Sequence, residues 1–518
     1  MQAFILCGHL TMNQQQYNRL FYVLSAFVLV EKMLVYFFFS IQYTDSDQTL
    51  LWQVAIDLSN GVFHGPCFYG QSYGPNIEPL LAVPFMKIGF PVYAALPLAT
   101  LILSTSPFFL LAFYFKQKLS AQSALIPLIV CLLLPLEYSL LTAIPRGFVG
   151  GIFFVSLGLF CWKYFRNNLS LVFAGIFIGL GLYGNLNSAL LLPLIIPSIH
   201  WNKKFILHAA LFFGVGFIVG LLPFYFNFQY YQAHPELLIH VAPSVQLSWS
   251  SFLETLYRFN NYFDQVSPLF WRFGFVSVLL LPAAIILLWK KNKRLEAWTI
   301  VFVLLAILGS FFLEKTKESS YSLFFSGGRF FLALPFVFIF LSLYFYSFLS
   351  SKNKLKFNRI ALLLAVVSFG IKTVFFSSLL SSAIDESKSW CVHVVRISDL
   401  KKQCSAMAEF GEQPSLYIAI TGDTPGQPVT YGCQCLQADF PSTYIPHYER
   451  RRWLISEYNK IVFPTILLHG KDTTRWDRSK FGHLDIVKHD KEKGWMLVRN
   501  SETTDVFLFE SGIVTPNK

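Results

Sequence analysis

Five charged residues, each next to the end of an apolar stretch, are the candidates for chemistry in this sequence. Asp45 and Asp47 follow the first apolar stretch, Glu78 lies shortly before the second, and Arg146 and Arg329 stand at the ends of later ones. A carboxylate can take a proton as a general base, and the planar, permanently charged guanidinium of arginine binds phosphate well. Acids beside arginines therefore predict chemistry on a substrate that carries a phosphate.

Each of these residues also has a plainer structural explanation. Asp45 or Asp47 could cap the helix expected to begin near Gln48, because aspartate is a favoured N-cap residue. Arg146 and Arg329 could be helix-end residues whose guanidinium groups reach the membrane surface. In an extended segment, however, residues two apart point to the same face, so Asp45 and Asp47 could serve one pocket. The sequence leaves both explanations open.

The composition indicates a membrane protein. Of the 518 residues, 54% are hydrophobic and only 14% are charged, which is too apolar for a soluble chain of this length. Apolar runs of about 17–25 residues recur along it. The net charge of +12 comes mostly from Lys and Arg in short loops between these runs, and the sequence holds no nucleic-acid-binding motif. We therefore expect no nucleic acid partner.

About eleven apolar stretches are predicted to be transmembrane helices, which makes the fold class a polytopic α-helical membrane protein. They are Phe21–Ser40, Pro91–Phe115, Ala121–Leu141, Gly147–Trp162, Ser170–Tyr183, Ser188–Ser198, Phe205–Phe228, Phe273–Trp289, Ala297–Leu313, Phe330–Leu349 and Ile360–Ser381. Gly184-Asn185 must divide one long run into the fifth and sixth. The first stretch lacks the pattern of a cleaved signal peptide, so we expect it to remain as a span.

The basic loops predict the orientation of these spans. With eleven spans, five basic loops fall on one side, which the positive-inside rule makes cytoplasmic. They are Lys116/Lys118, Lys163/Arg166, Lys203/Lys204, Lys290 to Arg294, and Lys352 to Arg359. The outer loop 41–90, the turn at Arg146 and the segment before Arg329 then lie together on the opposite, extracytoplasmic side. We expect a protein of the cytoplasmic (inner) membrane whose site lies on the extracytoplasmic side.

The chain changes character near residue 385. Residues 1–384 are predicted to form the transmembrane domain, and residues 385–518 a small soluble extracytoplasmic domain of α/β or α+β class. In this second part the apolar runs shorten to strand length, and turn signals separate them. The predicted strands are Ser415–Ile420, Ile461–Leu468, Trp495–Val498 and Val506–Phe509.

Four of the eight cysteines, Cys391, Cys404, Cys433 and Cys435, fall in this second domain. An oxidising extracytoplasmic setting favours one or two disulfides among them. A zinc site is the alternative, but Cys433 and Cys435 have one residue between them instead of the usual two to four.

Two charged clusters outside the outer loop receive structural interpretations. Glu31-Lys32 lies inside the first span, where adjacent residues cannot face each other on a helix, so an interhelical polar contact is favoured over catalysis. Arg450-Arg451-Arg452-Trp453 could rest on anionic lipid headgroups or could be a solvated face.

The order of these motifs resembles the GT-C superfamily of membrane glycosyltransferases, which includes lipid A aminoarabinose transferases and protein O-mannosyltransferases. Asp47-Gln48-Thr49 stands where relatives carry Asp-Glu-Thr, and Glu78-Pro79-Leu80 stands where they carry Glu/Lys-Pro-Pro-Leu. Gly328-Arg329-Phe330 is similar to the Arg-Tyr that opens a late helix. The resemblance covers about residues 20–380. Gln48 departs from the pattern, as does the single proline after Glu78.

The resemblance implies an inverting transfer of a sugar from a polyprenyl-phosphate donor to a lipid, glycan or protein acceptor at the outer face. Asp47 is then the general base, with Asp45 as its competitor. Glu78 orients the acceptor or helps to hold a metal. Arg146, Arg329 or both hold the departing phosphate.

Three residues of the outer loop complete the substrate-binding candidates. Tyr69 and Tyr73 could stack on the sugar or could be structural turn residues, and His64 lies nearby in the same loop. The outer-loop histidines His64, His234 and His240 lack ligand spacing, so a divalent metal is left open and no cofactor is certain. The alternative functions are a transporter or flippase of lipid-linked sugars and a non-catalytic protein of cell-envelope assembly.

Overall fold

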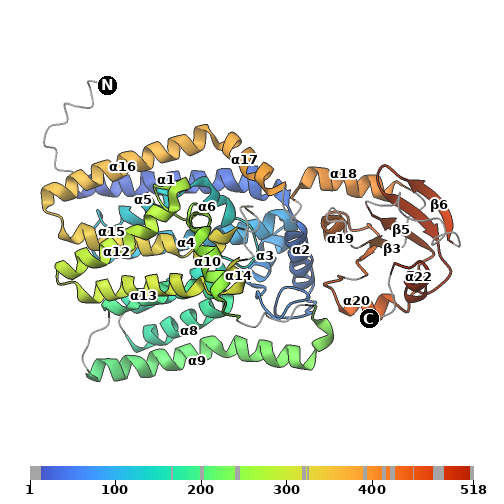
Figure 1. Ribbon diagram of the computed structural model, residues 1–518, viewed down its shortest axis with the longest axis horizontal. Coiled ribbons are helices and arrows are strands. Elements are labelled where there is room, and N and C mark those ends of the chain that lie inside the picture. Colours follow the sequence, from blue (N-terminus) through green and yellow to red (C-terminus); the bar gives the residue numbers. More distant parts are fainter. Residues whose placement is uncertain are drawn as a thin grey trace.

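The structure is a computed structural model of the 518-residue chain. It describes residues 13–164, 167–198, 203–239, 246–317, 323, 326–388, 394–410, 416–420, 426–446, 448–470 and 484–513. Long helices form an elongated body, and a smaller domain of strands and helices sits at one end of it (Figure 1). Helices α2 and α3 lie at this junction.

The helical body contains most of the helices and one short strand. It comprises α1 (Gln14–Val35), the π-helix η2 (Tyr36–Ser40), β1 (Tyr43–Thr44), α2 (Ser46–Ser59), α3 (Ile77–Lys87), α4 (Val92–Lys118), α5 (Leu125–Leu133), α6 (Leu136–Leu141), α7 (Gly150–Tyr164), α8 (Asn168–Gly184), η3 (Leu186–Ser198), α9 (Lys203–Ala233), η4 (Pro235–Leu237), α10 (Trp249–Tyr257), α11 (Phe259–Phe263), η5 (Trp271–Phe273), α12 (Gly274–Lys290), α13 (Arg294–Ser310), α14 (Glu314–Lys317), η7 (Gly327–Phe331), α15 (Leu334–Phe348), α16 (Ser351–Val374) and α17 (Phe376–Lys388). The smaller domain comprises β2 (Val395–Arg396), α18 (Ile397–Ala408), β3 (Leu416–Ala419), α19 (Gly426–Leu436), β4 (Ser442–Tyr444), α20 (Trp453–Tyr458), β5 (Thr465–His469), β6 (Asp485–Asp490), β7 (Trp495–Arg499) and α22 (Thr504–Glu510).

The predicted polytopic α-helical membrane fold is confirmed. Within the described residues, five helical segments are long and apolar enough to cross a membrane: Gln14–Ser40, Val92–Lys118, Leu207–Ala233, Trp271–Lys290 and Ser351–Val374. Four shorter apolar helices accompany them. Each of the eleven predicted stretches falls on helical segments.

Several predicted stretches differ in detail from single helices. Ala121–Leu141 is divided into α5 and α6, with extended backbone at Leu134 and Pro135 between them. Proline disfavours a helical conformation in the residue before it, which accounts for the break. The last stretch begins earlier than predicted, at Ser351, whose preceding residue Ser350 caps the helix.

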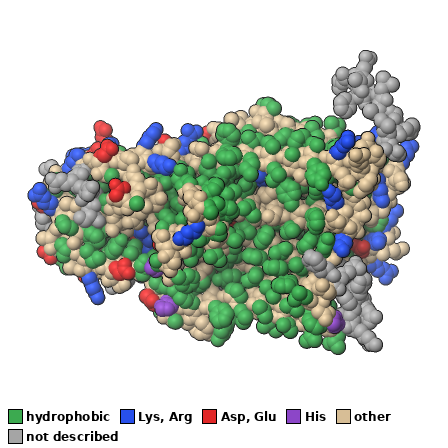
Figure 2. Space-filling view, turned by 180° about the vertical axis from the view of Figure 1, so that it is seen from behind, with side chains coloured by type: hydrophobic (Ala, Val, Ile, Leu, Met, Phe, Trp, Pro, Cys, Tyr) green, Lys and Arg blue, Asp and Glu red, His purple; other side chains and the backbone are tan. Residues whose placement is uncertain are grey.

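The surface of the helical body is that of a protein immersed in lipid. Hydrophobic side chains cover its middle, and Lys and Arg side chains gather at the end remote from the smaller domain (Figure 2). The starts of α9 and α16 lie at that basic end (Figure 1). The basic segments at the starts of α9 and α16 thus share one end of the body, opposite the smaller domain.

Glu31, Lys32 and Lys372 form a buried polar cluster inside the body. Glu31 on α1 forms a salt bridge of 2.5 Å with Lys372 on α16. The Nζ of Lys32 donates to the Oγ of Ser139 on α6 at 3.0 Å, and that hydroxyl donates to Glu31 at 2.7 Å. The predicted interhelical contact of Glu31-Lys32 is confirmed, and it connects three helices.

Helices α8 and α9 pack closely because glycines line their interface. A Cβ atom at Gly175 or Gly179 would lie within 3.0 Å of the backbone of α9, and one at Gly216 or Gly220 would lie as close to the backbone of α8. Small residues four apart allow this approach in membranes, where apolar side chains gain little by leaving lipid.

The smaller domain is an α/β fold with a five-stranded sheet in the order β4-β3-β5-β7-β6. Strands β4, β3 and β5 are parallel, and β7 and β6 are antiparallel to their neighbours. Three of the predicted strands are confirmed as β3, β5 and β7. The fourth, Val506–Phe509, is wrong because these residues belong to helix α22, whose buried side chains Thr504, Phe507 and Leu508 follow helical spacing.

The smaller domain shares a hydrophobic core with the helical body. Leu50 and Trp52 of α2 and Leu96 of α4 pack in one cluster with Leu400 of α18 and Val429 of α19. Strand β1 also pairs with β2. The domain is therefore attached to the body through the helix that carries the acidic residues.

One disulfide stabilises this junction. Cys404 of α18 and Cys433 of α19 are bonded, with their Cα atoms 5.5 Å apart, so the predicted disulfide is confirmed. Cys435 is a free thiol, and Cys391 lies outside the described residues.

Candidate active site

Asp45 and Asp47 stand at the start of helix α2 and differ in their contacts. Asp45 is the N-cap residue: its carboxylate accepts hydrogen bonds from the backbone N–H and the side-chain amide of Gln48, at 2.9 and 3.0 Å. The predicted capping role therefore applies to Asp45. Asp47 lies in the first helical turn, where a negative charge is also favoured by the helix dipole.

Both carboxylates face the guanidinium of Arg146, on the turn between α6 and α7. Its Nη2 lies 2.6 Å from Asp45 and 3.6 Å from Asp47. The side chains of Arg146 and Asp45 are 6% and 0% exposed, whereas that of Asp47 is 33% exposed. The two acids share Arg146 as a partner, as predicted for one pocket. They lie at the start of a helix, however, and not in the extended segment that was predicted. Only Asp47 is open to a substrate.

Glu78 holds the same turn from the other side. It lies in the first turn of α3, and its Oε2 accepts a hydrogen bond of 2.8 Å from the backbone N–H of Gly147. Gly147 has a φ of +74°, a conformation that favours glycine. Burial raises the pKa of Glu78 to about 8, although the hydrogen bond from Gly147 acts in the opposite direction. Glu78 thus positions the residue next to Arg146.

Two asparagines join the arginine turns and were missed as functional candidates. The side-chain amide of Asn185 donates to the carbonyl of Gly147 at 3.2 Å, and that of Asn187 donates to the carbonyl of Arg329 at 3.0 Å. The predicted break at Gly184-Asn185 is where α8 ends. The sequence signal was therefore present, but it was interpreted only as a helix break.

Arg329 and Tyr73 belong to the same charged group as Asp47. Arg329 lies in the short helix η7, is 8% exposed, and has its guanidinium 4.9 Å from the ring centroid of Phe330. The pKa of Tyr73 is raised, chiefly by burial, and the charges of Arg450, Asp47 and Arg329 also act on its hydroxyl. The site therefore combines α2, the outer loop, η7 and a residue of the smaller domain.

That residue, Arg450, was not predicted as part of the site. Its Nη2 lies 4.0 Å from the carboxylate of Asp47, and its guanidinium lies over the rings of Phe68 and Tyr448 at 5.0 and 5.2 Å. Gly70, with a φ of +77°, permits this approach, because a Cβ there would lie 3.2 Å from the Cα of Arg450. A contact between segments so distant in sequence leaves no local signal.

The other residues of this basic run are also packed against protein. Arg451 is buried and forms a salt bridge of 2.9 Å with Glu449, which is itself buried. The indole of Trp453 stacks on the imidazole of His64, with ring centroids 3.8 Å apart. Both predicted interpretations of the run, lipid headgroup contact and a solvated face, are wrong for Arg450, Arg451 and Trp453.

His64 and Tyr69 contact protein groups beside the site. The hydroxyl of Tyr69 donates to Asp57 at 2.6 Å, and its ring meets Trp453 edge to face. Burial lowers the pKa of His64 and raises that of Asp57. These contacts attach the outer loop to the smaller domain. A contact of either residue with sugar stays a prediction.

The candidate site contains acids and arginines, but the described part of the chain contains no group of three or more His, Cys, Asp or Glu side chains that could hold a metal ion. The geometry of the site supports acid–base and electrostatic roles for the residues present.

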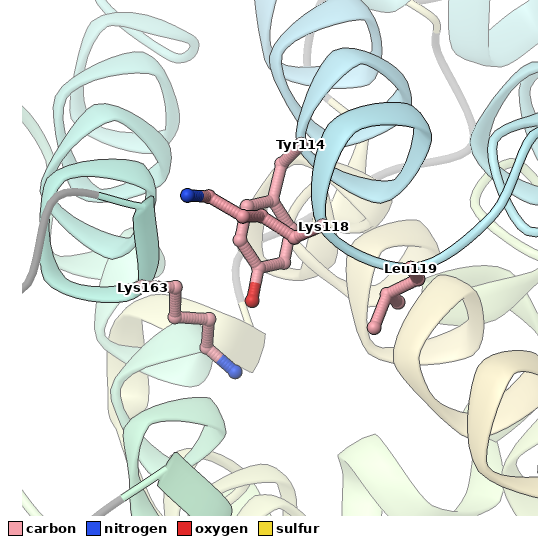
Figure 3. A pocket seen from close by; sticks show the side chains of 4 residues that line it. All are labelled: Tyr114, Lys118, Leu119 and Lys163. Atoms are coloured by element: carbon pink, nitrogen blue, oxygen red, sulfur yellow. The ribbon is translucent and has the colours of Figure 1, made fainter.

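Two cavities lie away from Asp47. One, of about 280 Å³, is mostly apolar and lies between the outer loop and the helices α8 and α9; Phe63, Tyr183, Phe226 and Tyr230 are among its lining residues. The other, of about 260 Å³, is lined by Tyr114, Lys118, Leu119 and Lys163 (Figure 3). It lies at the basic end of α4 and α7, so it is separate from the acidic site at the other end of these helices.

The fold of this chain has counterparts among solved structures. No family model and no curated protein matches the sequence. The structure is similar to two crystal structures of ArnT from Cupriavidus metallidurans, one bound to undecaprenyl phosphate and one in the apo state. Both are 12% identical to this chain and cover 95% of it and 99% of their own length, with TM-scores of 0.51 and 0.54.

This chain therefore shares the fold of ArnT. Because 95% of the chain is covered, the similarity includes the smaller domain, for which no resemblance was found in the sequence.

Proposed function

We propose that the protein is a membrane glycosyltransferase that moves a sugar from a polyprenyl-phosphate donor to an acceptor at the outer face of the membrane. The observation that supports this most is Asp47, an accessible carboxylate within 4.0 Å of two arginines at the end of the helical body. One structure with this fold is of a protein bound to undecaprenyl phosphate. The outer face holds no nucleotide sugars, so a lipid-linked donor is required there.

Asp47 acts as the general base in this proposal. It takes the proton of an acceptor hydroxyl while the hydroxyl oxygen forms a bond to the anomeric carbon of the sugar. The bond between that carbon and the phosphate oxygen breaks, its electron pair leaves with the polyprenyl phosphate, and the configuration inverts. The phosphate passes from a diester with one negative charge to a monoester with up to two, so nearby arginines stabilise the transition state more than the ground state.

The other candidates divide between substrate contact and positioning. We assign Arg329 to the phosphate, because its charge, like that of Asp47, acts on the hydroxyl of Tyr73. Arg146 is already bound to Asp45 at 2.6 Å, so we assign it the orientation of Asp47. Glu78 positions the Arg146 turn through Gly147. The apolar cavity beside the outer loop suits part of the prenyl chain.

A transfer assay tests this function. The full-length protein, reconstituted in lipid, receives undecaprenyl-phosphate-linked sugars and a panel of lipid, glycan and protein acceptors. We expect sugar transfer by the wild-type protein and a loss of roughly 10²–10⁴-fold with Asp47→Asn, the range that general base catalysis contributes. Near-normal transfer by that variant would exclude Asp47 as the base. Movement of donor across the bilayer without transfer would identify a flippase instead.

A further inference from the structure

Arg450 carries a buried donor that nothing in the described chain satisfies. Its side chain is 12% exposed, and its Nη1 is buried without a hydrogen-bond acceptor. The other terminal nitrogen, Nη2, donates to the hydroxyl of Tyr448 at 3.2 Å and lies 4.0 Å from Asp47. A charge-assisted hydrogen bond is about 2.7–2.9 Å long, so the pairing with Asp47 is loose. A buried, unsatisfied donor is unfavourable, and a ligand oxygen would satisfy it.

The segment around Arg450 is fixed in place. Glu449 accepts hydrogen bonds from the backbone N–H groups of Ile445 and Arg451, at 3.0 and 2.9 Å. Trp453 is stacked on His64. Arg450 therefore projects from a segment that is held on both sides. Binding of a ligand to Arg450 then costs little conformational entropy.

The two arginines that contact Asp47, Arg146 and Arg450, differ in their other contacts. Arg146 makes a short contact of 2.6 Å with the fully buried Asp45. Arg450 donates to the hydroxyl of Tyr448, makes only the loose contact with Asp47, and keeps its Nη1 without an acceptor. An incoming anion can therefore take Arg450 without disrupting a buried ion pair, and Asp47 then keeps one guanidinium instead of two.

Resting on the proposed function, we propose that Arg450, supplied by the smaller domain, binds the phosphate of the polyprenyl-phosphate donor. The smaller domain then contributes a substrate contact to a site whose other residues come from the helical body. Binding of the phosphate to Arg450 also leaves Asp47 with Arg146 as its remaining guanidinium contact.

Binding of two lipids that differ only in the phosphate tests this assignment. Undecaprenyl phosphate and undecaprenol are added to the full-length protein in detergent micelles, and bound lipid is measured by native mass spectrometry. The variants are Arg450→Ala, Arg450→Lys, and Arg452→Ala as a control of equal charge from the same segment. We expect Arg450→Ala to weaken undecaprenyl phosphate binding about 10- to 100-fold, the range for a hydrogen bond to a charged group, and to leave undecaprenol binding unchanged.

Each outcome separates the two proposals. Arg450→Lys keeps the charge but not the paired donors, so we expect it to recover part of the binding. Arg452→Ala should bind within about twofold of the wild type, because the arginines that contact Asp47 are Arg146 and Arg450. Tight binding by Arg450→Ala would overturn the role of Arg450 and leave the proposed function intact. A wild-type protein that does not distinguish undecaprenyl phosphate from undecaprenol would overturn the donor class and the role of Arg450 together. Retention of the Cys404–Cys433 disulfide and of the wild-type unfolding temperature verifies that the variants are folded.

Discussion

Asp45 and Asp47 present their carboxylates to the same nitrogen of Arg146, at 2.6 and 3.6 Å, yet the side chain of Asp45 is 0% exposed and that of Asp47 is 33% exposed. The inner acid neutralises the buried arginine and caps α2. The outer acid is left with one face toward solvent. This arrangement separates a buried carboxylate from an accessible one within three consecutive residues.

Substitution should separate these roles. Asparagine keeps the N-cap of α2, but Asp45→Asn leaves Arg146 buried without its closest charged partner, which we expect to cost about 3–5 kcal/mol in the free energy of unfolding. Asp47→Asn removes a partly solvated pair and should cost less than about 1 kcal/mol. Thermal unfolding of the purified variants measures the difference. Equal destabilisation by both would contradict the assignment.

Glu78 should make stability depend on pH. Its pKa in the folded protein, about 8, exceeds the ordinary value of 4.5 because the side chain is buried. Between these values the folded state holds a proton that the unfolded state has lost, so the free energy of unfolding falls as pH rises from about 4.5 to about 8. Glu78→Gln can still accept from Gly147 and should not show this fall. If the unfolding temperatures of the wild type and of Glu78→Gln change in parallel over this pH range, Glu78 is not the source of the pH dependence.

The disulfide should stabilise the smaller domain. Cys404 and Cys433 are 29 residues apart, and loss of such a bond typically costs about 2–4 kcal/mol. We expect the Cys404→Ser/Cys433→Ser double variant to unfold at a lower temperature. Cys435→Ser, which changes a free thiol, is the matched control. A reductant should lower the unfolding temperature of the wild type and leave the double variant unchanged.

The basic loops make a prediction about topology. Reporter fusions after Lys293 and after Lys518 should read opposite sides of the membrane, with Lys293 cytoplasmic. Lys293 lies in the turn between α12 and α13, at the end of the body remote from the smaller domain. If both fusions read cytoplasmic, the orientation is wrong, and the outer location of the site with it.

The helical body was predictable because apolar length is a strong signal. Every predicted span falls on helix, and the mid-span pair Glu31-Lys32 has the interhelical partners expected of buried charges. Pro135 and Ser351 show where the signal fails. The length of an apolar run predicts that a helix is present, but it predicts only weakly where the helix breaks or begins.

The site was predictable as far as its residues lie beside helix ends. Asp45, Asp47, Glu78 and Arg146 come together as expected, because the spans bring their ends to one face. Arg450 could not be found in the same way. Its place depends on the docking of the smaller domain on α2 and on the space left by Gly70, and neither is encoded in the residues around it.

The core shared by α2, α4, α18 and α19 sets an order of events during synthesis. The ribosome makes Leu50 and Trp52 early, but their partners Leu400 and Val429 emerge only after the last long apolar helix, α16. Until then the apolar side of α2 that α18 and α19 cover lacks these partners. A chain that ends before residue 400 lacks both these partners and Arg450, so completing the core of α2 and completing the candidate site require the same last part of the chain.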